Sequence, residues 1–401
     1  MKNTSQKLVP LALSVALFSS CSSAPDSSRT VLKTYRDPSA APKQPAAELG
    51  ESWGADDEAN SSEAVSHIEK MLVARTGGSA LMKRDAHPKH HGCVTAVFKI
   101  DSKALPAKNR VGVYAHDGDE FKAWVRFSNG DPDSTKPDTD GDVRGMAVKL
   151  MGVPETNFLT QAGVESTAGI VDFVMMNSPV FFIKNSADYA ALMRSLDTST
   201  AALLWFMATH PSTAIVLQKA RGMKVGNPLH LDYFSATPYR FGPDVGRFKF
   251  ASCVPLDKRD KRAKKAGPDY LRERLVASLG ADEACFDVYA RIASAHDAKL
   301  VENPMKPWNL KKSPYVKVAR LTIPKQTGID SEPQLAFCEN VNFNPWRTPP
   351  ENRPLGAINR VRLQAYGQIS DLRHGHNRVP QLQPKDHDVC TGETAPLCRK
   401  L

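Results

Sequence analysis

The residues best suited to chemistry are concentrated in one short stretch. Three of the chain's eleven histidines, His87, His90 and His91, fall within five residues. The alternating residues 94–100 that follow predict a β-strand that enters a core. Titratable side chains at the mouth of a buried strand indicate acid–base chemistry, although a solvated loop or an adventitious metal patch is the commoner meaning of such a cluster. A zinc site would use His87 and His91 at i, i+4, but Pro88 argues against a helix through that spacing.

Two other polar features stand beside apolar segments. Residues 131–142 carry five aspartates but lack EF-hand spacing and its terminal Glu, so we expect a solvated loop and not a calcium site. The apolar run 172–183 is interrupted by the amide of Asn177. This amide needs partners, because a buried unpaired polar group costs about 1–3 kcal/mol.

The patterns around these residues predict a mixed β and α structure. Strands are expected at 110–115, 121–127, 144–150, 315–323 and 334–341, and paired strands within 227–253. Helices are expected from Ser61 onward and over 187–210, and residues 270–279 and 284–295 are expected to be helical or mixed segments. Residues 345–354 form a proline-rich extended connection, and the basic residues 258–265 an exposed loop.

Composition bounds the class of protein. The chain has 401 residues, 41% hydrophobic, which allows a large core in one domain or two. The net charge of +10 gives a generally basic surface, but nothing concentrates it into a nucleic-acid-binding module.

The first 60 residues predict export. Lys2 and Lys7 precede an apolar run at 8–18, and small residues lead to Cys21. The stretch ending at Cys21 resembles the lipobox of bacterial lipoproteins, in which the cysteine is acylated; a soluble signal peptide is the alternative. We expect a leader at 1–21, a flexible tether at 22–60 and a folded domain at 61–401, exported to the cell envelope and in contact with membrane through a lipid anchor only.

Six further cysteines allow up to three disulfides in an exported protein, with fifteen possible connectivities. Cys390 and Cys398 are close enough to close a small loop. Cys93, beside the histidines, has two alternatives: it pairs with another cysteine, or it is a buried free thiol.

Five motifs occur in the order found in haem catalases. They are Arg84-x-x-His87-x-Lys89, Val125-Arg126-Phe127-Ser128, Arg144-Gly145-x-Ala147-Val148-Lys149, Asn177-x-Pro179-x-Phe181-Phe182-Ile183 and Arg362-x-x-x-Tyr366, with Arg373 following. The chain therefore resembles the haem catalase family, and within it the short, exported catalase-like proteins. His90 and His91 depart from the small residues usual there, and only 35 residues follow Tyr366, so the usual helical C-terminal region is missing.

The resemblance implies an α+β fold, a catalase-like antiparallel β-barrel with surrounding helices and a long wrapping arm. It implies haem b as cofactor, with Tyr366 as the proximal iron ligand stabilised by Arg362. His87 would be the distal acid–base group, oriented by Ser128, and Asn177 would polarise the bound peroxide. The family positions that pair with the haem propionates are matched by Arg84, Arg126 and Arg373.

The function implied is breakdown of hydrogen peroxide by a catalase, with some peroxidase activity. Two alternatives remain open: an enzyme that converts organic or fatty-acid hydroperoxides, and a non-enzymatic haem-binding protein. The oligomeric state is left open by the sequence.

Overall fold

The computed structural model describes residues 42, 44–78, 81–262 and 265–388. The expected leader with Cys21, most of the expected tether, and Cys390 and Cys398 lie outside the described residues.

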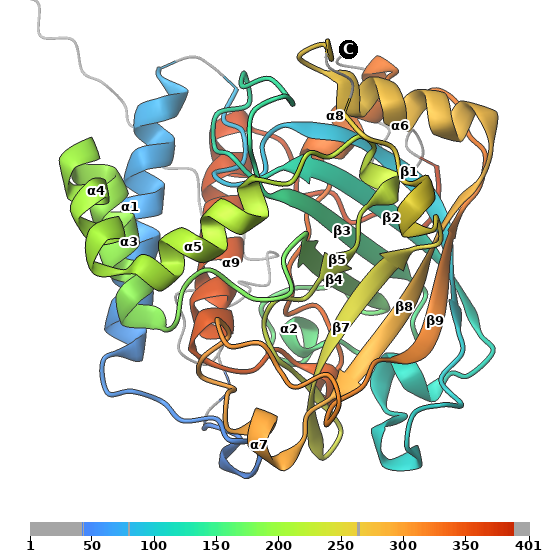
Figure 1. Ribbon diagram of the computed structural model, residues 1–401, viewed down its shortest axis with the longest axis horizontal. Helices are drawn as coiled ribbons and strands as arrows, with labels where there is room; N and C mark the ends of the chain where they lie inside the picture. Colours follow the sequence, from blue (N-terminus) through green and yellow to red (C-terminus); the bar gives the residue numbers. More distant parts are fainter. Residues whose placement is uncertain (1–41, 43, 79–80, 263–264, 389–401) are drawn as a thin grey trace, which may run out of the picture. The chain divides into compact units, whose positions relative to one another are not determined.

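The described residues build one large antiparallel sheet that closes on itself (Figure 1). Its strands are β1 (His90–Ile100), β2 (Glu120–Asn129), β3 (Arg144–Met151), β4 (Ile170–Met176), β5 (Tyr233–Phe234), β6 (Tyr239–Phe241), β7 (Asp244–Ser252), β8 (Ala284–Ile292) and β9 (Val316–Ile323). The strand order is β5-β4-β3-β2-β1-β9-β8-β7-β6, and a further pairing of β5 with β7 joins the two ends. The sheet is therefore an eight-stranded antiparallel β-barrel with β6 as an appendage, which confirms the predicted fold class.

Large side chains fill the interior of the barrel. Phe98, Phe127, Phe173 and Phe250 are at most 6% exposed and belong to one apolar cluster. Phe98 lies with its ring centroid 5.7 Å from that of Phe173 and 6.0 Å from that of Phe250. Alternate residues of each strand point into this cluster, as the period of two requires. The barrel is thus a packed core, and any site must lie outside it or at its ends.

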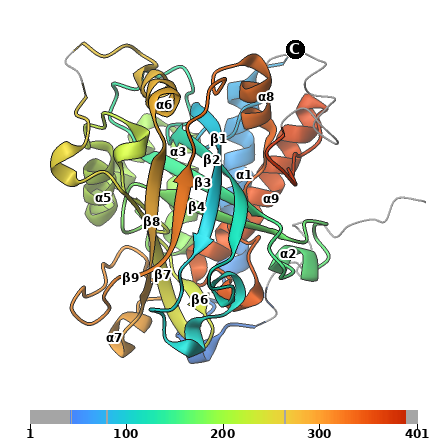
Figure 2. The same cartoon turned by 90° about the vertical axis from the view of Figure 1, so that its right-hand side faces the viewer.

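Helices cover one side and one end of the barrel (Figures 1 and 2). They are α1 (Asp57–Thr76), α2 (Phe158–Gln161), α3 (Ser186–Thr198), α4 (Thr200–Thr209), α5 (Pro211–Arg221), α6 (Tyr270–Ala281), α7 (Ala295–Ala298), α8 (Glu332–Asn340) and α9 (Ala357–Asn377). In Figure 1 α1, α3, α5 and α9 gather on one side of the barrel, and in both views α6 and α8 lie near one end of β1.

The helical side has an apolar core of its own. Ile68 and Leu72 of α1, Leu192 of α3 and Val361 of α9 are buried in one cluster. The α9 helix is therefore held between this helical layer and the barrel, and it is the element that carries Arg362, Tyr366 and Arg373.

Folded structure begins earlier than the predicted boundary at residue 61. Helix α1 starts at Asp57, and Glu51 is only 4% exposed. The Glu51 carboxylate pairs with Arg353 at 2.7 Å and with Arg360 at 3.4 Å. Its charged partners lie far along the chain, so no local pattern signals that this segment packs against the domain.

Three predicted elements are wrong. Residues 110–115 contain a 3₁₀ turn at Gly112–Ala115 instead of a strand. Residues 284–292 form strand β8 and not a helix, and residues 332–340 form helix α8 and not a strand. The α8 helix has Pro333 in its first turn and Ser331 before it, which are ordinary signals of a helix start.

Two disulfides link distant segments. Cys93 of β1 is bonded to Cys338 of α8, and Cys253 is bonded to Cys285. The alternative of a free thiol at Cys93 is therefore wrong. The bond between Cys93 and Cys338 fixes α8 beside β1, which begins at His90.

The connection from β9 to α9 is the long arm expected from the resemblance. Arg347 of this arm is fully buried and pairs with Glu165 and with Asp172. Asp172 also accepts a hydrogen bond from the buried Lys149 at 2.7 Å. These charges compensate one another, which is the condition for burying them, and they hold the arm against β3 and β4.

Candidate active site

Antiparallel pairing brings four segments singled out in the sequence to the same end of the barrel. His87 lies three residues before β1, and Ser128 lies near the end of β2, opposite His90. Gly145, at the start of β3, pairs with Ser128 and also with Met176 at the end of β4. Asn177 follows directly. The register alone thus places His87, Ser128 and Asn177 at the same end of neighbouring strands.

His87 occupies an unusual backbone position. Its φ is 62°, in the left-handed region that residues with a Cβ rarely adopt. The strain is offset by fixed partners: its N–H donates to the carbonyl of Gly130 at 3.3 Å, and its own carbonyl accepts from Arg126 at 2.8 Å. The conformation turns the imidazole toward Ser128, whose Oγ is 3.1 Å from Nδ1 of His87.

The imidazole of His87 is neutral at pH 7. Burial, and then the nearby charges of Arg126, Arg362 and Arg84, lower its pKa to about 3. A neutral imidazole can accept a proton from a ligand. Because Ser128 engages Nδ1, Nε2 is the atom through which His87 would exchange protons with a ligand.

Gly145 gives this imidazole its space, a role that sequence reasoning missed. A Cβ at Gly145 would lie 2.5 Å from Nδ1 and from Cε1 of His87, and 3.0 Å from Oγ of Ser128. Such distances are far inside van der Waals contact. The glycine of the third motif is therefore required by the close approach of His87 and Ser128 to the β3 backbone.

The orientation of Asn177 is fixed by backbone groups on two sides. Its Oδ1 accepts from the N–H of Arg144 at 2.9 Å, and its Nδ2 donates to the carbonyl of Ala220, in α5, at 3.4 Å. The side chain is 3% exposed. These bonds supply the partners that a buried amide needs, and Nδ2 keeps a second hydrogen that can be donated to a ligand.

The α9 helix supplies the other half of the candidate site. Arg362 lies one turn before Tyr366, and its Nη2 donates to the phenol oxygen at 3.2 Å. Its guanidinium carbon is 5.1 Å from the centre of the Tyr366 ring. Arg362 is held from behind by Thr237 and Asn359, at 3.3 and 3.2 Å. A phenol facing a fixed cation is suited to bear negative charge.

A third group of residues is a cluster of three arginines with one carboxylate. Nη1 of Arg84 is 3.4 Å and Nη1 of Arg373 is 3.1 Å from Oε1 of Glu339. Arg126 is 4% exposed, and among the described residues nothing pairs with its Nε. Glu339, which the sequence analysis missed, lies on α8, the helix that was predicted to be a strand.

The charge of this cluster is not balanced. Burial and then the charge of Arg84 lower the pKa of Arg126 well below its ordinary value, and burial and Arg84 also lower the pKa of Arg373 to about 9. Three guanidinium groups against one carboxylate leave two positive charges uncompensated among the groups named here. An anionic ligand with two carboxylates would correct this imbalance.

The structure therefore brings the predicted residues at the end of the barrel close to those on α9. The charges of Arg84 and Arg126, from the arginine cluster, and of Arg362, the partner of Tyr366, all act on His87. Cys21, the predicted lipidation site, lies outside the described residues.

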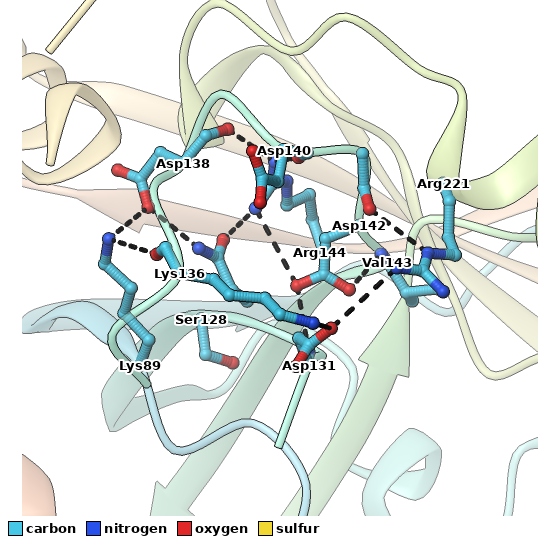
Figure 3. Close-up of polar contacts among 12 residues, drawn as sticks. Lys89, Ser128, Asp131, Lys136, Asp138, Asp140, Asp142, Val143, Arg144 and Arg221 are labelled. Atoms are coloured by element: carbon cyan, nitrogen blue, oxygen red, sulfur yellow. Dashed lines mark hydrogen bonds and ion pairs between the residues drawn. The ribbon is translucent and has the colours of Figure 1, made fainter. Parts of the chain in front are cut away.

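The acidic segment 131–142 is a largely exposed loop, as expected, but two of its aspartates, Asp138 and Asp142, are buried (Figure 3). Asp138 is fully buried and accepts from Asn129 at 2.8 Å, from Lys89 at 3.1 Å and from the N–H of Leu271 at 2.9 Å. Asp131 pairs with Lys136 at 2.7 Å. The carboxylates thus anchor this segment behind the histidine stretch.

His91 belongs to this network and not to a metal site. Its Nε2 is 2.9 Å from Oδ1 of Asn129, and its Nδ1 is 3.9 Å from Asp138. Burial lowers its pKa to about 3, although Asp138 opposes the shift. Among the residues that the structure describes, no three His, Cys, Asp or Glu side chains gather to hold a metal ion.

Known proteins resemble this chain in sequence and in fold. The sequence profile of the family described as Catalase matches residues 73–210, the part of the chain that carries Arg84, His87, Arg126, Ser128 and Asn177. A catalase-related peroxidase of Mycolicibacterium paratuberculosis is 27% identical over 326 residues, which cover 78% of this chain and 96% of that protein. A catalase of Schizosaccharomyces pombe is 23% identical over 302 residues, 68% of this chain and 55% of its own length.

Two solved structures have the same fold. A fungal catalase superimposes with a TM-score of 0.59 at 17% identity, covering 76% of this chain and 61% of its own. Catalase A of Saccharomyces cerevisiae gives 0.59 at 18% identity, with coverages of 77% and 64%. The chain thus spans less than two thirds of these two structures and of the fission yeast enzyme.

In sequence this chain is similar to catalases and to a catalase-related peroxidase, and in fold it is similar to catalases.

Replacing Gly145 by alanine should displace the His87 imidazole without unfolding the barrel. We expect peroxide turnover to fall about 10²-fold, because a displacement of about 1 Å at a reacting group has that effect. Turnover and thermal unfolding of Gly145→Ala are compared with those of Gly280→Ala, where a Cβ meets no atom within 4 Å. Equal turnover in both variants would show that the close approach of Gly145 does not position His87.

Replacing His91 by glutamine should flatten the dependence of stability on pH. His91 titrates near pH 6.5 when unfolded and near pH 3 when folded. Between these values the unfolded state binds more protons, so the free energy of unfolding falls as the pH is lowered, by at most about 1.4 kcal/mol per pH unit for one histidine.

Urea unfolding at several pH values between 4 and 7 measures the slope, which should be smaller for His91→Gln than for wild type. His296→Gln is the control, at a histidine whose side chain is 72% exposed. A slope for His91→Gln equal to that of the wild type would contradict the buried, neutral state of His91.

Proposed function

We propose that this protein is a haem-dependent catalase with peroxidase activity that breaks down hydrogen peroxide in the cell envelope. The observation that carries the proposal is the juxtaposition of three groups: the neutral imidazole of His87, the Arg362–Tyr366 pair, and the arginine cluster of Arg84, Arg126 and Arg373 with its two uncompensated positive charges. The name of the mycobacterial relative, a catalase-related peroxidase, supports the peroxidase part.

The residues present fit a haem. A haem carries two propionate carboxylates, which match the excess charge of the arginine cluster and would give Nε of Arg126 the partner it lacks among the described residues. The phenol of Tyr366, held at 3.2 Å from Arg362, fits the role of a tyrosinate iron ligand. When bound, the haem b that we propose supplies the redox chemistry with peroxide.

The chain's own residues move and hold protons. His87 accepts a proton from one peroxide oxygen through Nε2 and returns it to the other oxygen, while Ser128 keeps the ring in place through Nδ1. Asn177 donates its remaining Nδ2 hydrogen to the peroxide and polarises it. Because burial keeps the pKa of His87 near 3, the imidazole is ready to accept a proton throughout the neutral range.

We further propose that residues 1–21 are a leader and that Cys21 is acylated, which would anchor the protein to a membrane of the cell envelope. The charged start, the short apolar run and the small residues before Cys21 support this proposal. A single acyl chain binds a membrane only marginally, so a stable anchor requires the several chains that a mature lipoprotein carries.

Replacing Tyr366 by phenylalanine should abolish or strongly weaken haem retention, because it removes only the ligand oxygen. The absorption spectrum of protein purified and reconstituted with haem measures this directly. Tyr315→Phe serves as a matched control at a tyrosine outside the site. Wild-type protein that remains colourless after reconstitution would refute the proposed function.

Replacing His87 by alanine should lower hydrogen peroxide turnover by about 10²–10⁴-fold, the range typical of a general acid–base group. Asn177→Ala should lower it less, because the amide polarises the peroxide but moves no proton.

Stopped-flow kinetics with hydrogen peroxide, cumene hydroperoxide and a fatty-acid hydroperoxide would compare the substrates. We expect slow oxygen evolution from hydrogen peroxide together with oxidation of small phenolic donors. Fast rearrangement of the fatty-acid hydroperoxide without oxygen evolution from hydrogen peroxide would replace the proposal by the organic hydroperoxide alternative.

A further inference from the structure

Helix α4 is apolar on every face, yet half of it is exposed. Its inward side carries Phe206, which is 3% exposed and packs in the helical core with Leu203 and Met207. Its outward side carries Leu204 and Trp205, which are 65% and 73% exposed. The exposed Ala201 and Ala208 complete this outward face at helical spacing.

Such a helix is normally buried on all sides. Single exposed hydrophobic residues are ordinary on protein surfaces, and Leu310, 63% exposed in a turn before β9, is one of them. A contiguous helix face with Trp205 at its centre is different, because contiguous exposed apolar patches mark places where a partner or a membrane binds.

Helix α5 continues the apolar surface. Ile215 is 51% exposed, and Met223, just beyond the helix, is 39% exposed. Within the described part of the chain, no helix on its own has the length and hydropathy to cross a membrane. Among these helices, only α4 and α5 taken together have the required length and hydropathy, and the pair is bent by 105° at His210.

The two helices themselves carry charge of one sign, although Asp188 of α3 lies 3.8 Å from His210 between them. Residues 198–231 contain no Asp or Glu, whereas Lys219, Arg221 and Lys224 are all exposed near the end of α5. Arg221 approaches Asp131 of a neighbouring segment at 3.8 Å, but its side chain remains 50% exposed. The apolar face is therefore bordered by cations, which complement the anionic head groups of a lipid bilayer.

A second copy of the chain fits this surface less well. Self-pairing about a two-fold axis brings the same patch of both copies together. The lysines that border the face would then approach their own counterparts with no acidic residue from 198–231 to compensate them, and like charges across an interface are unfavourable.

We propose that α4 and α5 lie in the surface of an anionic lipid bilayer. Leu204, Trp205 and Ile215 enter the boundary of the acyl chains, while Lys219 and Lys224 contact the head groups. This contact is made by the folded domain itself and adds to any anchor at Cys21. It goes beyond the proposed function and does not depend on it.

Flotation with lipid vesicles tests the proposal on protein that starts at Ser22, which lacks the predicted leader and Cys21 but keeps every contact described above. The vesicles are phosphatidylcholine alone or mixed with phosphatidylglycerol. We expect the wild-type protein to float with the mixed vesicles. The double variant Leu204→Ser/Trp205→Ser should weaken partitioning by about tenfold or more.

Matched variants separate this effect from unfolding and from general hydrophobicity. Leu310→Ser, at a residue of similar exposure, should float as the wild type does. Lys219→Gln/Lys224→Gln should weaken binding to the mixed vesicles by about fivefold for each lysine. Circular dichroism reports whether each variant is folded. In Trp205→Phe, which keeps the face apolar, quenching of tryptophan fluorescence by brominated lipid should decrease while flotation persists.

Several results would overturn the proposal. One is wild-type protein that floats with neither type of vesicle. Another is a loss of flotation that is equal in Leu310→Ser and in the α4 double variant. A third is a wild-type dimer in sedimentation that the α4 double variant converts to monomer without any vesicle binding, which would assign the face to a second copy. Because flotation needs no bound haem and no turnover, its outcome is distinct from that of the proposed function.

Discussion

The candidate site depends on an excess of buried positive charge. Arg84, Arg126 and Arg373 come from three separate segments and converge on the single carboxylate of Glu339. Removing cations from water is costly unless anions compensate them, and their mutual repulsion adds to that cost. A protein that keeps such a cluster has a reason to bind an anion there. Burial keeps the His87 imidazole neutral, and the charges of Arg126 and Arg84 from the same cluster act in the same direction. The proposed cofactor binding and the protonation state of His87 are thus linked through Arg84 and Arg126.

The rest of the fold maintains this arrangement. The disulfide between Cys93 and Cys338 joins β1, the strand that begins at His90, to α8, the helix that carries Glu339. Cys93 is also paired with Arg126 in the β1–β2 register. One covalent bond therefore fixes the carboxylate of the cluster relative to the strand pair that carries Arg126. An oxidising compartment would preserve this bond, which agrees with the proposed export of the protein.

The sequence predicts the barrel and the site residues better than it predicts individual elements. The motifs are short, their order is informative, and the residues near His87 do meet in space. Residues 284–292 carry a strand signal that was overlooked, because Phe286, Val288 and Ala290 alternate with polar residues and are the ones buried; which strands they pair with, β7 and β9, no local pattern shows. Gly112, with φ of +53°, breaks an apparently alternating segment so that the chain can approach Asn352, a contact across about half the chain. Glu339 and Gly145 acquire their roles only through such long-range contacts.

The two sides of Asn177 connect the candidate site to the helical surface. Its Oδ1 is fixed by the β3 backbone beside Arg144, and its Nδ2 contacts the carbonyl of Ala220, near the end of α5. Helix α5 also continues the exposed apolar face of α4. A displacement of α5 would therefore act directly on the amide that we assign to the peroxide, with no intermediate residue. If this helix rests on a bilayer, the lipid surface supports one wall of the site, and peroxides formed in that bilayer arise next to the element that contacts Asn177.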